Sequence, residues 1–143
     1  MQGIKRKVVH ATLYEAVAIA MLAVIMQPIA GKGLGDTGPF AIACSVIAVS
    51  WNLVYNTLFE AWERRQVDRR RTPRRRALHA IGFEGGLVLM TLPLIAWALD
   101  MGWWAALLAD LGLVALFLVY TFCFNWVFDH VFGLPASAQQ AGP

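Results

Sequence analysis

Four stretches of about 20 mainly apolar residues constrain the fold more than any other feature, because a helix needs about that length to cross a membrane's hydrocarbon core. They cover residues 8–30, 39–59, 80–99 and 103–128 of the 143-residue chain. Little chain remains for a soluble catalytic domain, and a hydrophobic content of 59% exceeds that of ordinary soluble domains. The sequence therefore predicts an all-α membrane protein of four transmembrane helices.

Positive charge is unevenly distributed between the loops. Eight arginines lie between Arg64 and Arg76, and Lys5, Arg6 and Lys7 precede the first span, whereas the other two loops hold only Lys32. The positive-inside rule then predicts that both termini and the Arg-rich loop are cytoplasmic. Such a run could also bind nucleic acid or anionic lipid, but we favour orientation because it lies between two spans without a nucleic-acid motif.

The first span and the cysteines need no special function. The first apolar run resembles a secretory signal, yet it is too long and lacks a small-residue cleavage site, so we predict a retained helix. Cys44 and Cys123 lie inside spans without a ligand pattern, which predicts packing residues and neither a metal site nor a disulfide. Catalytic and cofactor motifs are also lacking, so we expect no enzyme and no cofactor.

An internal repeat organises the chain. A gapless offset of 69 residues aligns 7–15 with 76–84, giving basic-x-x-His-Ala-x-x-aromatic-Glu twice, and it also aligns 51–60 with 120–129. Each copy holds two spans, so the repeat is parallel in the membrane. We predict hairpins at 1–66 and 76–132, an Arg-rich linker at 67–75 and a flexible tail at 133–143. Short connections at 31–38 and 100–102 require the two spans of each hairpin to be antiparallel.

Two glutamates, Glu15 and its repeat mate Glu84, are the strongest candidates for chemistry. Glu15 lies about 12 Å beyond Lys7 along a helix, inside the apolar run. A carboxylate there is costly, so it favours its protonated form until a cation arrives, and it can exchange a proton for a cationic substrate. Gly85 and Gly86 follow Glu84 and would let a helix or a bulky ligand approach closely.

Polar and aromatic stripes recur on the second and fourth spans at four-residue spacing. Amides and hydroxyls can bind a ligand, and aromatic faces attract organic cations, but the same residues often hold helices together or form an interfacial belt. We weigh the two roles of the aromatic residues equally. The predicted substrate-lining residues are Tyr14, Trp51, Asn52, Tyr55, Asn56, Phe83, Thr121, Phe124, Asn125 and Trp126.

A cluster of charged and titratable side chains is expected at the cytoplasmic surface. It could relay protons through its histidines, although we prefer a structural collar of salt bridges. Asp110 has no repeat mate, because the offset pairs it with Ala41, and we expect it near the outer interface, so it ranks below the glutamates as an exit-side proton or substrate site. The members of the cluster are Lys7, His10, Glu60, Arg76, His79 and Asp129.

These paired motifs resemble the proteobacterial antimicrobial compound efflux family across all four spans. The resemblance implies two tandem bacterial transmembrane pair domains and places the family's membrane glutamate at Glu15. Lys7, Tyr14 and Glu60 depart from the usual Arg, Phe and Asp but keep charge or aromaticity. The other motif positions fall on His10, Trp51, Asn52, Tyr55, Asn56, His79, Phe83, Glu84, Asn125, Trp126 and Asp129.

The resemblance implies a transporter of the bacterial inner membrane that exchanges protons for organic cations such as chlorhexidine, acriflavine-type dyes, quaternary ammonium compounds or short-chain diamines. Because four helices make a thin wall around a drug, we expect a homodimer or a monomer–dimer equilibrium in the lipid bilayer. The alternatives are a membrane scaffold whose polar motifs only join helices, and a passive cation channel.

Overall fold

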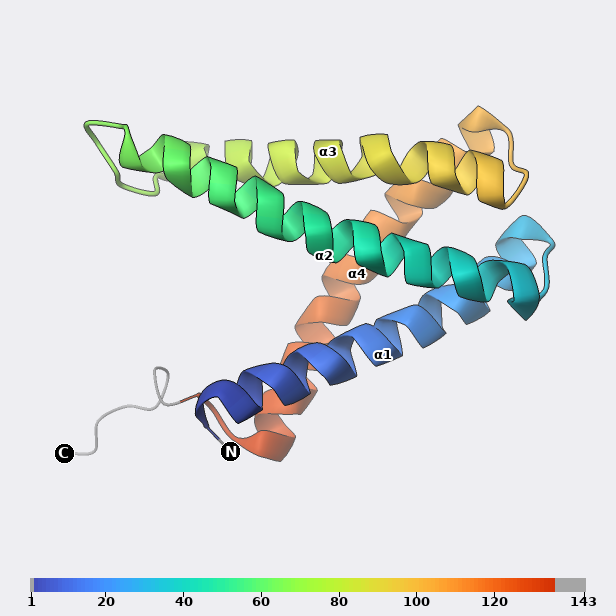
Figure 1. The fold of residues 1–143 in the computed structure, drawn as a ribbon, viewed down its shortest axis with the longest axis horizontal. Coiled ribbons are helices and arrows are strands. Elements are labelled where there is room, and N and C mark those ends of the chain that lie inside the picture. Colours follow the sequence, from blue (N-terminus) through green and yellow to red (C-terminus); the bar gives the residue numbers. More distant parts are fainter. Residues whose placement is uncertain (1, 136–143) are drawn as a thin grey trace.

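The computed structural model describes residues 2–135, which form four long helices, α1 (Gly3–Ala30), α2 (Leu34–Arg64), α3 (Pro73–Ala98) and α4 (Trp103–Phe132). Each helix is long and apolar enough to span a membrane. The expected all-α architecture of two consecutive helical hairpins is therefore confirmed (Figure 1). Of the predicted tail, residues 136–143 lie outside the described part of the chain.

The helices are longer than the apolar runs that predicted them. Hydropathy follows the hydrocarbon thickness, whereas helical hydrogen bonding continues through the polar interface, so α1 begins at Gly3 and α4 ends at Phe132. The first connection was predicted too long, because α2 already begins at Leu34. The backbone N–H of Thr37 donates to Gly33 O at 3.1 Å, and Asp36 in the first turn suits the positive end of the helix dipole.

The three-residue turn after α1 depends on a glycine. Gly31 has a φ of +65°, and its N–H donates to Gln27 O, which closes the C-terminus of α1. A residue with a Cβ rarely adopts this backbone conformation. The turn directs α2 back along α1, and these two helices form the most extensive contact in the bundle.

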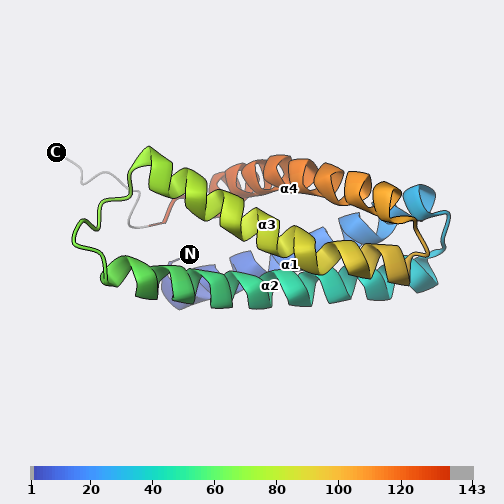
Figure 2. The same ribbon diagram turned by 90° about the horizontal axis from the view of Figure 1, so that it is seen from above.

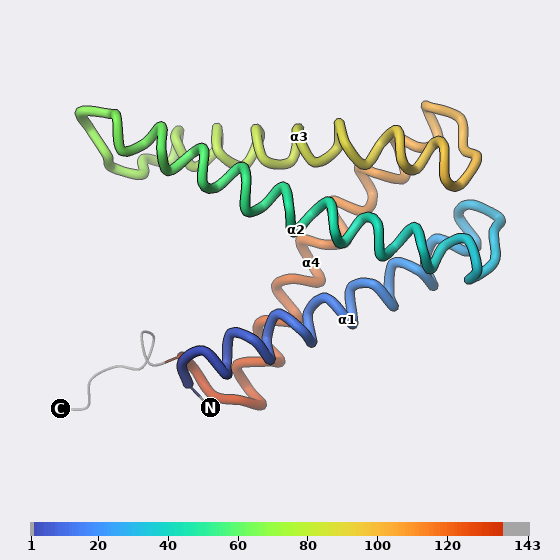
Figure 3. Tube along the Cα trace, viewed as in Figure 1, coloured from blue at the N-terminus to red at the C-terminus, as the bar shows by residue number. Residues whose placement is uncertain are grey.

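The helices run along one long axis, with like connections at the same end (Figures 1 and 2). The start of α1, the α2–α3 loop and the end of α4 lie at one end, which we call the arginine-loop end. The α1–α2 and α3–α4 turns lie at the other, the short-turn end. The tube in Figure 3 shows α4 passing behind α2 and crossing α1 toward the arginine-loop end.

Hydrogen bonds reproduce the 69-residue repeat between the hairpins. His10 Nε2 lies 2.7 Å from Asn125 Oδ1 between α1 and α4, and the matching pair His79 and Asn56 joins α3 to α2 at 2.9 Å. The hydroxyl of Tyr120 donates to Tyr14 O at 2.8 Å. At the matching positions, Trp51 Nε1 donates to Phe83 O at 2.9 Å. The α1–α4 and α2–α3 contacts are thus equivalent, as a pseudo-twofold arrangement requires.

One of these two equivalent contacts is closer than the other. Gly82 and Gly86 of α3 face Tyr55 and Trp51, and a Cβ at either glycine would overlap the aromatic side chain. Small residues let helices approach in a membrane, where no hydrophobic effect drives their association. The offset places Leu13 and Val17 at the matching positions of α1. Larger side chains thus stand where α3 has its close-contact glycines, and the α1–α4 contact is less extensive than the α2–α3 contact.

Fully buried apolar side chains lie toward the short-turn end. Met26, Ile95 and Leu99 are inaccessible to solvent, and Phe40 is 3% exposed. They come from α1, α2, α3 and the start of the α3–α4 turn, and Ala106 adds a contact from α4. This packing closes the bundle at the short-turn end and leaves the more open space further along the helices.

Candidate functional site

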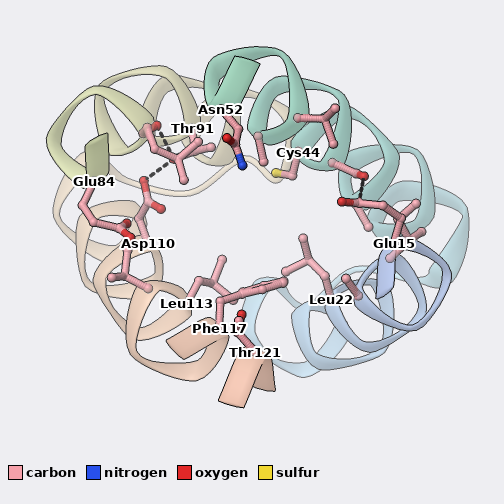
Figure 4. Close-up of a pocket in the computed structure, with 18 of the residues that line it drawn as sticks. Glu15, Leu22, Cys44, Asn52, Glu84, Thr91, Asp110, Leu113, Phe117 and Thr121 are labelled. Carbon is pink, nitrogen blue, oxygen red and sulfur yellow. Dashed lines mark hydrogen bonds between the residues drawn. The ribbon is translucent and has the colours of Figure 1, made fainter. Parts of the chain in front are cut away.

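A cavity of about 420 Å³ lies between the four helices and is lined by residues from each of them (Figure 4). Its walls are mainly aliphatic side chains such as Leu22, Leu113 and Ile95. Three carboxyl groups interrupt this apolar lining, those of Glu15, Glu84 and Asp110. A cavity of this size and lining has the usual features of a small-molecule site, namely mostly apolar walls with a few polar groups.

Glu15 of α1 forms one side of the cavity. Ser45 Oγ of α2 donates a short hydrogen bond to Glu15 Oε2, so the carboxyl group is held between the two helices of the first hairpin. Sequence reasoning identified the glutamate but missed the serine. A lone hydroxyl in an apolar span is a weak signal, and its repeat position is Val114.

Asp110 of α4 lies across the cavity from Glu15 and beside Glu84 (Figure 4). Its residue is only 4% exposed, and Thr91 Oγ1 lies 2.8 Å from its Oδ2. Asp110 ranked below the glutamates because it has no acidic repeat mate. The structure instead places it in the same cavity as both of them, because α4 begins at Trp103 and Asp110, at the start of its third turn, lines the cavity.

Thr91 connects Asp110 to the backbone of α3. Its hydroxyl lies 2.9 Å from Leu87 O as well as 2.8 Å from the aspartate oxygen. One hydroxyl carries one proton, so it can donate to only one of these acceptors at a time. Both bonds form together when Asp110 is protonated and donates to the threonine. The pair therefore suits a carboxyl group that holds and releases a proton.

The predicted substrate-lining residues divide into two groups. Those that line the cavity are Tyr14, Asn52, Phe83 and Thr121. Those that lie elsewhere are Trp51, Tyr55, Asn56, Phe124, Asn125 and Trp126. In the second group, Trp51 and Tyr55 donate to carbonyl groups of α3, and Trp126 is 65% exposed and stacks on His130. The polar and aromatic stripes thus serve the helix contacts as well as the cavity wall.

The charged cluster at the arginine-loop end differs in membership from the one expected. His10 and His79, the two histidines of the expected cluster, each form a side-chain hydrogen bond with an asparagine. Arg6, which is 8% exposed, forms a short ion pair with Asp129 and donates to Gly133 O at 2.5 Å. Lys7, expected in this role, is exposed. The rotation of α1 about its own axis determines which of these adjacent basic side chains faces α4.

The matching basic residue of the second repeat is Arg75, and it also differs from expectation. Its guanidinium lies 3.9 Å from Glu63, whereas the predicted members Arg76 and Glu60 are both exposed. The cluster therefore consists of two separate groups, one around Arg6 between α1 and α4, and one around Arg75 between α2 and α3.

Comparisons with known proteins agree with this architecture. A family model described as "Chlorhexidine efflux transporter" matches residues 2–65 and again 71–134, once on each hairpin. The chain is 42% identical over 127 residues to a protein of Acinetobacter baylyi named "Short-chain diamines transporter", covering 89% of both chains. A protein of the same name from Acinetobacter baumannii is 39% identical, and the match covers 89% of this chain and 88% of the relative. Another from Vibrio parahaemolyticus is 36% identical, and the match covers 87% of this chain and 89% of the relative. No solved structure matches the chain.

Proposed function

Because the chain belongs to the family described as chlorhexidine efflux transporters, we propose that this membrane transporter is a proton-coupled antiporter that exports small organic cations. The observation that carries the proposal is the apolar cavity with carboxyl groups from α1, α3 and α4. We propose short-chain diamines as the physiological substrates. Chlorhexidine-like, acriflavine-like and quaternary ammonium biocides are further substrates of the same site.

The cavity supports antiport through a charge argument. Three ionised carboxylates in one apolar cavity would repel one another and lose most of their hydration, so such a site needs protons or cations to neutralise it. Protons and a cationic substrate then compete for the same groups. If substrate is captured on one side of the membrane and released on the side of higher proton concentration, protons and substrate cross the membrane in opposite directions.

The position of the carboxyl groups supports a substrate with two positive charges. Glu15 lies on one side of the cavity, and Glu84 and Asp110 lie on the other (Figure 4). A short-chain diamine carries an ammonium group at each end of an apolar chain. Its ends can pair with opposite sides of the cavity while its methylene groups contact the aliphatic wall between them. A protonated cavity has no such attraction for the diamine.

The unequal contacts between the hairpins support alternating access. Between α1 and α4, the side-chain hydrogen bonds come from the first 14 residues and from residues after 119, all toward the arginine-loop end. Between α2 and α3, Gly82 and Gly86 let the two helices pack closely against each other. We propose that opening occurs where α1 and α4 meet, as the hairpins rock about the α2–α3 contact.

The remaining parts of the proposal concern location and assembly. The basic residues at the arginine-loop end favour a cytoplasmic position for that end and for both termini, in a bacterial inner membrane. Large apolar side chains such as Val119, Phe122 and Val131 are exposed on α4, as lipid contact or a homodimer would require. We propose a dimer in equilibrium with a monomer.

Proteoliposomes test the antiport directly. The protein is reconstituted with an acidic lumen and a pH-sensitive dye, and 1,5-diaminopentane is added outside. We expect substrate-dependent loss of luminal protons with the wild type and none with Glu15→Gln, which keeps the shape of the side chain but cannot ionise. Asp100→Asn is the matched control: it removes a carboxylate from an exposed turn, where φ is +51° and asparagine is well tolerated.

The other outcomes identify the alternatives. Diamine uptake that needs no proton gradient and moves no protons would indicate a passive cation channel. Folded, inserted protein that moves neither protons nor any cation of the panel would leave the scaffold as the better account, and the antiport proposal would be abandoned.

A further inference from the structure

A second, smaller cavity lies at the arginine-loop end, outside the carboxyl-lined site. It has a volume of about 90 Å³ and is lined by Phe59, Arg71, Arg75, Arg76 and His79. Three of its five lining residues are arginines, so its character is opposite to that of the larger cavity. We call it the arginine pocket.

One guanidinium nitrogen at this pocket lacks an acceptor. Arg75 Nη2 donates to Asp68 O at 2.9 Å, but Arg75 Nη1 is buried and has no hydrogen-bond partner within residues 2–135. The nearest carboxylate oxygen, on Glu63, is 3.9 Å away, which is too far for a hydrogen bond. A buried charged donor without an acceptor is unfavourable. An anionic oxygen entering the pocket would supply the missing acceptor.

The charges around the pocket also favour an anion. The first turn of α3 contains no acidic residue and carries Arg74, Arg75 and Arg76 next to the positive end of the helix dipole. Glu63 pairs with Arg71 at 3.1 Å and is the same carboxylate that Arg75 approaches. Glu63 therefore pairs with two guanidinium groups, and Glu60 adds a second negative charge that acts on Arg71. Arg76, whose Nε donates to Arg71 O at 3.2 Å, brings a third positive charge, so three guanidinium groups face two carboxylates. The positive charge is in excess.

We propose that the arginine pocket binds a phosphate group. Arginine presents several donors in a planar fork that suits phosphate oxygens, and a cavity of about 90 Å³ admits one such group. The phosphate neutralises the N-terminus of α3 and holds the loop against the two helices. The cationic substrates of the larger cavity have no attraction for this site, so the proposal is independent of transport.

The surroundings favour a phosphate carried by an anionic lipid. The pocket lies at the helix ends, where a membrane-spanning helix meets the headgroup layer. Arg75 lies over the ring of Trp62 at 5.3 Å, and Trp62 is 46% exposed, as an interfacial tryptophan is. Phe59 gives the pocket an apolar wall on the membrane side of the arginines. Free phosphate has the same chemistry but makes no use of these aromatic neighbours.

Lipid titration of the purified full chain in a neutral detergent tests the proposal. Phosphatidylglycerol, phosphatidylcholine or inorganic phosphate is added, and bound lipid is counted by native mass spectrometry alongside the thermal unfolding midpoint. We expect phosphatidylglycerol to bind and to raise the midpoint, and phosphatidylcholine to do neither. Arg76→Gln and Arg75→Gln should each weaken binding by about tenfold, the effect of losing one charge-assisted hydrogen bond.

Arg74→Gln is the matched control, since it removes the same charge from the same turn but does not line the pocket. It should weaken binding by less than about threefold, through long-range charge alone. Arg76 is exposed, so its variant is expected to fold even if Arg75→Gln does not. Competition by inorganic phosphate at equal potency would identify free phosphate as the ligand. Equal losses in Arg74→Gln and Arg76→Gln, or no selective binding of either phosphate source, would overturn the proposal.

Discussion

Replacing Asp110 with Asn isolates the contribution of the second side of the cavity. The substitution keeps the size of the side chain, and its amide N–H can donate to the Thr91 hydroxyl as a protonated Asp110 does across the 2.8 Å between Asp110 Oδ2 and Thr91 Oγ1, so that Thr91 keeps its bond to Leu87 O. It removes only the ability to carry a negative charge and to exchange a proton. We therefore expect the stability of the protein in detergent to change by less than about 1 kcal/mol.

The expected loss of affinity follows from the position of Asp110 across the cavity from Glu15. A diamine whose ends pair with both sides loses one charge-assisted hydrogen bond in Asp110→Asn. Such a bond contributes about 1.5 to 3 kcal/mol, which corresponds to a rise in Kd of about 10- to 150-fold. A monoamine that pairs with Glu15 alone keeps its main partner, and its Kd should change by less than about threefold.

Isothermal titration calorimetry with 1,5-diaminopentane and 1-aminopentane measures both values on ligands of equal carbon length. The Kd of the monoamine divided by that of the diamine should fall toward one in Asp110→Asn. The same ratio should keep its wild-type value in Asp100→Asn, which removes an exposed carboxylate outside the cavity. The reasoning fails if Asp110→Asn weakens both amines by the same factor, because Asp110 would then act on the whole cavity and not on the second ammonium group. It also fails if neither Kd changes.

Two further substitutions test the frame of the bundle. Gly86→Ala places a methyl group against the indole of Trp51 and should destabilise the protein by about 1 to 3 kcal/mol in thermal or denaturant unfolding. Gly85→Ala should not destabilise it, because no described atom would lie within 4 Å of the added Cβ. Equal effects of the two substitutions would disprove the close α2–α3 contact. Arg6→Gln removes the bonds to Asp129 and Gly133 O between α1 and α4 and should cost about 1 to 3 kcal/mol, more than Lys7→Gln, whose side chain is exposed. Identical unfolding of the two variants would contradict the assignment of Arg6.

The spans and the repeat could be predicted because each depends on a strong, one-dimensional signal. A membrane fixes the length and apolar character of a spanning helix, and a gapless duplication keeps its motifs in register. The helix ends are less predictable. The connection predicted at 31–38 contains glycines at 33, 35 and 38, yet α2 begins at Leu34 and includes the last two of them. Backbone hydrogen bonds through the interface outweighed their low helix propensity.

The site was predicted in part, for a different reason. Glu15 and Glu84 stand out because a carboxyl group is costly in an apolar span. Ser45, Thr91 and the adjacent pair of Arg6 and Lys7 do not stand out, because their roles depend on how each helix is rotated and where it crosses its neighbour. The repeat gave no support to Asp110, although it lines the same cavity, since a residue that occurs in one copy only has no mate.

The differences between the two copies lie where a transporter needs them. The copies share the His–Asn pairs and the bonds from Trp51 and Tyr120 to backbone carbonyls, which set the equivalent α2–α3 and α1–α4 contacts. Around the cavity they diverge, because Asp110 has Ala41 as its mate and Ser45 has Val114. A symmetric frame with an asymmetric lining gives one cavity with two unlike sides. Duplication of one hairpin can thus supply the scaffold, and a few later substitutions can supply the chemistry.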